Sequence, residues 1–89
     1  MNKTQDMIVQ VCDGMKQFLL GKNEAYGNSA IEPVRIFSKT DTDEQINVRI
    51  DDKLSRIMNG NEYDGDDTIK DLIGYLILKI VLKNMKQEN

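Results

Sequence analysis

The segment 67–86 is apolar on almost every side, and this feature constrains the fold more than any other. One set of apolar residues recurs at the spacing of an α-helix and forms a stripe: Ile69, Ile73, Leu76 and Ile80. A second set widens the apolar surface to nearly the full circumference: Leu72, Ile77, Leu78, Val81 and Leu82. A helix of this kind is buried, and three short helices cannot bury it alone. We therefore predict a helical bundle that is completed by association with further copies of the chain.

The chain has 89 residues, which allows one small domain with a thin core. At this size folding buries roughly 64% of the surface of the unfolded chain, and small proteins commonly self-associate to bury more apolar surface. Apolar residues make up 39% of the chain and charged residues 30%, as in a globular protein. The size excludes a two-domain enzyme and a large cofactor enclosed by one chain.

The charged and reactive residues exclude several classes of function. The chain has 12 basic and 15 acidic residues, and this balance does not favour duplex nucleic acid as a partner. The absence of histidine removes histidine-based catalysis and most zinc sites. The single cysteine, Cys12, suggests a reducing compartment, and we expect it to face helix packing. No apolar run is long enough for a bilayer and no signal peptide is visible, so we predict no membrane association.

The first half of the chain is predicted to contain one long helix and one short helix. Apolar residues at helical spacing predict the first helix over residues 4–20, with Thr4 as N-cap and Gly21 just past its end. Residues 21–42 are interpreted as a loop and a short helix, which begins at Pro33. A segment that is mostly loop is unusual in so small a domain unless it is functional.

The second half is predicted to contain two helices joined by an acidic linker. Overlapping capping boxes begin the helix 43–58, and four apolar residues form a single stripe along it: Ile46, Ile50, Leu54 and Ile57. The linker 59–66 leads into the last helix, 67–86. The fold class is therefore all-α, with three main helices and the short helix that follows the loop.

Two groups of charged residues are candidates for a binding site. Arg49, Lys53 and Arg56 share one face of the second predicted helix, which fits either a solvated surface with local ion pairs or a phosphate-binding face. Asp67 and Asp71 lie one turn apart and fit either a favourable charge at a helix N-terminus or a Mg²⁺ site. Both lie opposite the Ile69 stripe, so we expect them on the outside or at a second interface.

Three motifs carry a resemblance to a known family. They are Lys22-Asn23-Glu24-Ala25-Tyr26-Gly27-Asn28-Ser29, the Arg-x-x-Asp-Lys-x-x-Arg pattern of residues 49–56, and the Asp-Thr-x-x-Asp-Leu-x-Gly-Tyr pattern of residues 67–75. Together they resemble the nucleotide-modification-associated domain family of small phage and prophage proteins. The resemblance implies a nucleotide ligand and the cytoplasm of an infected bacterial host.

The last two motifs are also similar, more distantly, to the all-α nucleoside triphosphate pyrophosphatases of the MazG and dimeric dUTPase type. That resemblance implies that Asp52, Asp67 and Asp71 hold Mg²⁺ against a nucleotide. Those enzymes carry a Glu-Glu-x-x-Glu cluster, whereas this chain has Asp51 and Asp52 followed by Lys53. Half of the metal shell is missing, so a protein without catalysis and without a cofactor is favoured over an enzyme.

These observations lead to one main functional hypothesis. Tyr26 is expected to stack a base, and Asn28 and Ser29 to contact base or ribose edges. The cations expected to hold phosphates are Lys22, Lys39, Arg49, Lys53 and Arg56. We expect a phage protein that sequesters a nucleotide, or a cyclic or ADP-ribose-type immune signal, between subunits of a homo-oligomer.

Two alternatives remain open at this point. One is a Mg²⁺-dependent pyrophosphatase of the MazG type, with the three aspartates as metal ligands. The other is a non-enzymatic structural or protein-binding phage module, in which the loop motif only braces the helices.

Overall fold

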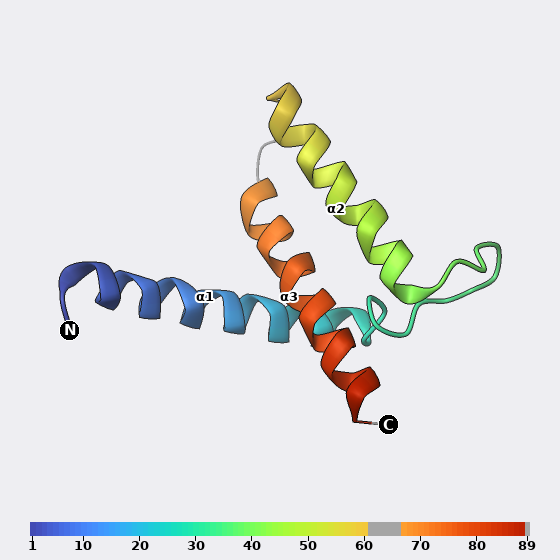
Figure 1. Cartoon of the computed structure of the whole chain (residues 1–89), viewed down its shortest axis with the longest axis horizontal. Helices are drawn as coiled ribbons and strands as arrows, with labels where there is room; N and C mark the ends of the chain where they lie inside the picture. Colours follow the sequence, from blue (N-terminus) through green and yellow to red (C-terminus); the bar gives the residue numbers. More distant parts are fainter. Residues whose placement is uncertain (61–66, 89) are drawn as a thin grey trace.

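The computed structural model describes residues 1–60 and 67–88 of the chain. The described residues form three α-helices, α1 (Lys3–Tyr26), α2 (Thr42–Asn59) and α3 (Thr68–Gln87), and contain no strand (Figure 1). The all-α prediction is confirmed. Of the predicted acidic linker 59–66, residues 61–66 lie outside the described part of the chain.

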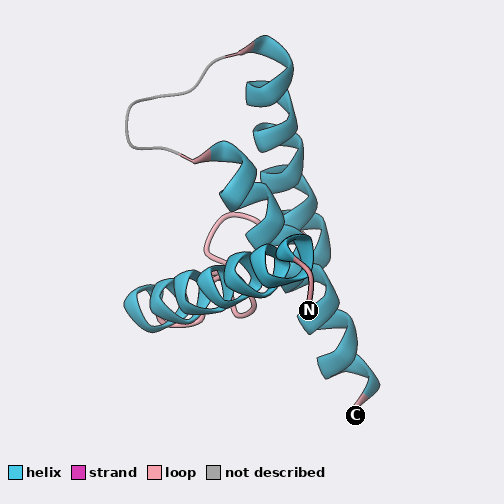
Figure 2. Cartoon of the chain, turned by 90° about the vertical axis from the view of Figure 1, so that its left-hand side faces the viewer, coloured by secondary structure: helices cyan, strands magenta, loops and turns pink. Residues whose placement is uncertain are grey.

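Helices α2 and α3 pack side by side in opposite directions, and ion pairs at two levels join them. Near the start of α2, Lys79 of α3 lies 3.0 Å from the Asp43 carboxylate. Further along α2, Lys53 lies 3.5 Å from Asp71 of α3. Helix α1 crosses α3 near its middle, and the N-terminal part of α1 projects away from the α2–α3 pair (Figures 1 and 2).

Helix α1 is longer than predicted. It begins at a capping box in which Asn2 and Gln5 bond each other's backbone, one residue before the expected start. It continues through Gly21 and ends at Gly27, which adopts the left-handed conformation with φ 62°. One glycine weakens a helix interior by only about 1 kcal/mol, so the neighbouring turns carry the helix past it. As a result, Lys22 and Tyr26 stand on a helix and not on a loop.

The predicted short helix at Pro33 is wrong, because the structure describes these residues as bends and irregular backbone. In this segment, hydrogen bonds from side chains to backbone carbonyls take the place of the backbone hydrogen bonds of a helix. The Arg35 guanidinium donates to the Thr40 carbonyl and to Thr42 Oγ1, at 2.6 Å for the latter. Lys39 Nζ donates to the Arg35 carbonyl at 2.9 Å. These bonds hold residues 35–42 as a folded loop against the start of α2.

Helices α2 and α3 begin and end within one residue of their predicted bounds. Asp41 caps α2 by accepting from the Glu44 backbone N–H at 2.8 Å. Asp67 caps α3 by accepting from the Lys70 backbone N–H at 2.9 Å. Among the described residues, no helix is both long and apolar enough to cross a membrane.

The core is thin and lies where the three helices meet. Three apolar side chains of the described residues are buried: Met15, Ile46 and Leu82. On α3, Leu72, Ile77 and Leu78 are half-buried. The stripe that begins at Ile69 is exposed instead, so α3 packs through its other apolar side.

The crossing of α1 and α3 depends on Gly74. This residue is buried, and a Cβ atom added to it would lie 3.0 Å from Leu19 Cδ2 of α1. The missing side chain therefore lets the two helices approach closely. This contact fixes the C-terminal third of α1 above the middle of α3 and forms one wall of the cavity described below.

The extended α1 can be tested with a Gly21→Ala variant. We expect it to raise the free energy of unfolding by about 1 kcal/mol, because alanine is the better helix former and an added Cβ meets nothing within 4 Å. Gly27→Ala is the matched control and is expected to lower that free energy by about 1 kcal/mol, because its φ is positive. Urea unfolding measures both. Destabilisation by Gly21→Ala would place the end of α1 at residue 21.

Candidate functional site

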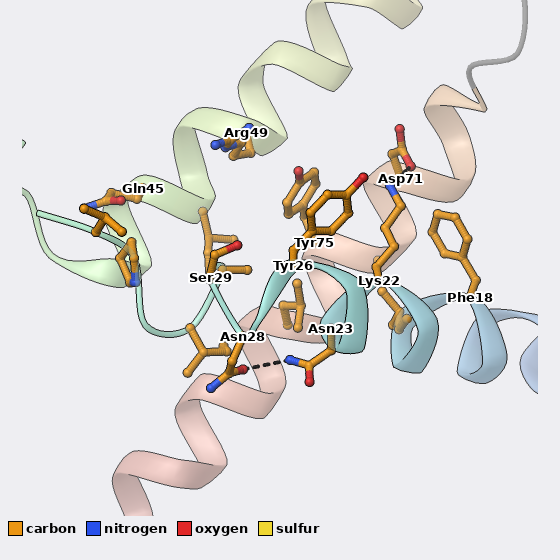
Figure 3. A pocket seen from close by; sticks show the side chains of 18 residues that line it. Phe18, Lys22, Asn23, Tyr26, Asn28, Ser29, Gln45, Arg49, Asp71 and Tyr75 are labelled. Carbon is orange, nitrogen blue, oxygen red and sulfur yellow. Dashed lines mark hydrogen bonds and ion pairs between the residues drawn. The ribbon is translucent and has the colours of Figure 1, made fainter.

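A cavity of about 580 Å³ lies where α1, α2 and α3 meet (Figure 3). Its walls come from the C-terminal third of α1, the first half of α2, the middle of α3 and the loop that follows α1. Small-molecule sites occupy roughly 300–1,000 Å³, so the cavity has the volume of a ligand site. Its apolar lining includes Leu19, Ile46 and Leu78.

A carboxylate shared by two lysines forms one edge of this cavity. Asp71 of α3 lies 3.4 Å from Lys22 of α1 and 3.5 Å from Lys53 of α2, through its two different oxygens. The Asp71 and Lys53 side chains are only 18% and 14% exposed, whereas the Lys22 side chain is 47% exposed, so the cluster joins all three helices with one lysine open to solvent. Two cations against one anion leave the cluster with a net positive charge.

Arg49 adds a second cationic group. It stands on α2 and lines the cavity across from Tyr26 and Lys22 (Figure 3). It is exposed, and it makes no hydrogen bond or ion pair with any residue that the structure describes. Its planar guanidinium therefore has its donors available for an anionic ligand.

Aromatic side chains line the same cavity. Tyr26, in the last turn of α1, is 67% exposed, and Tyr75 of α3 is half-buried beside it in the cavity lining. Phe18 lies nearer the N-terminus of α1 than Tyr26 does. Lys22 Nζ is 4.7 Å and Lys70 Nζ is 4.4 Å from its ring centroid. Flat apolar surfaces next to cations are suited to a planar ligand that carries negative charge.

Side-chain amides complete the lining. Asn23 Nδ2 donates to Asn28 Oδ1 at 2.8 Å (Figure 3). Asn28 follows Gly27 and shares its left-handed conformation, with φ 65°. Asn28 and Ser29 line the cavity, as does Gln45 of α2, whose Nε2 donates to the Thr40 carbonyl at 2.8 Å. The three side chains offer both donors and acceptors to a polar ligand.

The structure brings together five of the eight predicted ligand-binding residues, which all line the cavity: Lys22, Tyr26, Asn28, Ser29 and Arg49. Lys53 is not in the lining but adjoins it through Asp71. Lys39 and Arg56 do not line the cavity. Lys39 donates to the Arg35 carbonyl in the loop, and Arg56 lies 3.4 Å from Asp52.

Asn23, Gln45 and Tyr75 also line the cavity and were not predicted. Helical spacing offered a signal for one of them, because Asn23 and Tyr26 are three residues apart on α1 and therefore neighbours on its surface. Gln45 and Tyr75 become neighbours of that surface only through the packing of α1 on the α2–α3 pair.

The three aspartates proposed as metal ligands are not gathered. Asp52 pairs with Arg56 and is 54% exposed, Asp67 caps α3, and Asp71 is held between two lysines. In the described part of the chain, no group of three or more acidic or cysteine side chains is arranged to hold a metal ion. These residues do not fit a Mg²⁺ site of the pyrophosphatase type.

The structure bears on two further expectations about single residues. Asp71 was expected opposite the Ile69 stripe, on the outside or at a second interface, and it lies at an interface, the junction of the three helices. The reason is that α3 packs through the side opposite the Ile69 stripe. Cys12 was expected to face helix packing, but it is exposed on the projecting part of α1.

Comparisons with models of protein families, with curated proteins and with solved structures gave no match to this chain.

Proposed function

We propose that this protein binds a nucleotide, or a signal derived from a nucleotide, in the cavity between its three helices and retains it without chemical change. The observation that carries the proposal is the position of Arg49. This unpaired cation, among the described residues, lines a nucleotide-sized cavity that two tyrosines also line. The three sequence motifs support the proposal, because residues of all three line the cavity.

The cavity offers a complementary group for each part of a nucleotide. Arg49 supplies a fork of donors that matches phosphate oxygens, and Lys22 supplies a point charge at the cavity edge. Tyr26 and Tyr75 offer faces on which a base can stack. Asn28, Ser29 and Gln45 supply the hydrogen bonds that read the polar edges of a base or ribose.

The acidic residues of the site favour retention of an intact ligand over its hydrolysis. Hydrolysis of a nucleotide needs a group that activates water, and the chain has no histidine. Asp71 is the acidic residue of the described cavity lining, and both of its oxygens are engaged by lysines. A protein that holds the ligand intact removes a signal from solution when it is abundant and binds tightly, which would counter a host defence that depends on the signal.

A binding and release experiment tests this function. The protein is dialysed against nucleoside triphosphates, cyclic dinucleotides and ADP-ribose-type nucleotides, with and without Mg²⁺, and is then denatured so that released molecules can be analysed by mass spectrometry. We expect depletion of one ligand class and recovery of the same molecule intact. Recovery of a monophosphate with pyrophosphate would replace the proposal with the pyrophosphatase. No depletion of any ligand would contradict both nucleotide functions and leave the structural module.

Arg49→Ala tests the phosphate contact. We expect the affinity for the retained ligand to fall about 10- to 150-fold, because a charged hydrogen bond contributes about 1.5–3 kcal/mol. Lys83→Ala is the matched control, since Lys83 is exposed on α3 and does not line the cavity. Isothermal titration calorimetry gives both affinities. Equal affinities for the two variants would remove Arg49 from the site.

A further inference from the structure

Apolar side chains form an exposed face along α1 and α3, which we call the α1–α3 apolar face. Its six residues are Ile8 and Val11 of α1 and Ile69, Ile73, Leu76 and Ile80 of α3. Each of them is at least 36% exposed, and Ile8, Val11, Ile69 and Ile80 are more than half exposed. Val11, Ile69 and Ile73 line one shallow groove between the two helices, so the α1 and α3 parts are continuous.

The α1 part of this face extends an existing helix contact. Met15 follows Val11 by one helical turn on the same side of α1, and Met15 is buried. The N-terminal half of α1 carries the same stripe beyond the end of that contact and projects from the α2–α3 pair (Figure 1). The apolar spacing of a packed helix surface therefore continues along the N-terminal half of α1, where α2 and α3 do not cover it.

The accessible surface is larger than that of a compact chain, and the exposed loop before α2 contributes to it together with the α1–α3 apolar face. It measures 7043 Å² for the chain. A compact monomer of 10.2 kDa has about 5,300 Å², so the excess is about 1,700 Å². The radius of gyration is 14.9 Å, against about 12 Å for a compact chain of this length. Obligate homodimers bury about 1,000–2,500 Å² on each subunit, and the excess lies within that range.

Two observations select a second copy of the chain as the partner. First, the described core has three buried apolar side chains, so a partner that completes it must be present whenever the chain folds. A second copy meets that condition. Second, the chain presents both an uncovered stripe on a projecting helix and an uncovered stripe on α3. In a twofold-symmetric contact, the α1 stripe of each chain covers the α3 stripe of its partner, so both stripes of both chains are buried.

We infer that the α1–α3 apolar face is the self-association interface of this protein and that the chain is an obligate homodimer, or a larger assembly built from that dimer. The inference is independent of ligand binding, because none of the six residues of the face lines the cavity.

The mass of the wild-type protein in solution tests the inference. Light scattering after size exclusion is expected to give at least twice the 10.2 kDa of one chain at micromolar concentration. The thermal unfolding midpoint is expected to rise by about 3–4 °C for each tenfold increase in concentration, as for a dimer that unfolds on dissociation. A mass of one chain together with a midpoint that does not depend on concentration would overturn the inference and assign the face to a different partner.

Matched variants then locate the interface. Ile73→Glu and Ile8→Glu each place a charge on the face, and both are expected to lower the mass to that of one chain or to abolish folding at concentrations where the wild type is folded. Phe37→Glu is the control, because Phe37 is 96% exposed in the loop before α2 and lies outside the face. We expect Phe37→Glu to keep the mass of the wild type. An assembly that survives both changes on the face, or that is lost only in Phe37→Glu, would overturn the assignment.

Discussion

Replacement of Ile46 by alanine is expected to lower the free energy of unfolding by about 2–4 kcal/mol, the largest loss for any single truncation of the described core. Ile46 is 2% exposed and is the most buried apolar side chain of the described residues. It stands in the first turns of α2 and lines the cavity, whose walls also come from α1 and α3. Truncation removes buried apolar surface and leaves a space that a thin core cannot refill.

Chemical unfolding at fixed protein concentration measures this effect. Ile46→Val is expected to lose about 1 kcal/mol, which places it between the wild type and the alanine variant. Val48→Ala on the same helix is the matched control, because Val48 is 64% exposed. Its effect is expected to stay within about 0.5 kcal/mol. Equal losses for Ile46→Ala and Val48→Ala would show that α2 does not pack through Ile46.

Asp71→Asn is expected to lower the free energy of unfolding by about 1–3 kcal/mol. The change removes the negative charge that Lys22 and Lys53 share, and leaves two cations facing each other across the junction of three helices. The estimate lies below that for a fully buried pair, because the Lys22 side chain is 47% exposed and solvent screens part of its charge.

Asp52→Asn is the matched control for this change. Asp52 also pairs with a cation, Arg56, but it is 54% exposed and lies within one helix, so its loss is expected to be about 0.5 kcal/mol or less. A double change of Asp71 to Leu and Lys53 to Met is expected to recover most of the stability, because it removes both buried charges together. Similar losses for Asp71→Asn and Asp52→Asn would mean that the three-helix charge cluster does not form.

The helix pattern was predictable where capping residues and apolar spacing agreed. Asp41 and Gly60 bound α2 in the structure as the sequence indicated. The end of α1 was not predictable in the same way, because Gly21 and Gly27 both suit a helix end. Beyond Gly21, Lys22 pairs with Asp71 of α3, a residue that lies far away in the sequence, and the Gly27 N–H closes the helix on the Asn23 carbonyl.

The cavity was predictable in part, for a similar reason. The motif of residues 22–29 grouped Lys22, Tyr26, Asn28 and Ser29, which are close together in the chain, and all four line the cavity. The role of Asp71 depends on which side of α3 packs. Because α3 is apolar on nearly every side, the sequence pattern does not distinguish its packed side from its exposed side.

The central claim, that the three-helix cavity holds a nucleotide, is tested most directly by the amide chemical shifts of the isotope-labelled protein during titration with the retained ligand. We expect the shifts to change mainly at residues 22–29, around Arg49 and at residues 71–78, and to change little in residues 3–14 of α1. Changes confined to the projecting part of α1 or to the C-terminal end of α3, or no changes with any nucleotide, would contradict the claim.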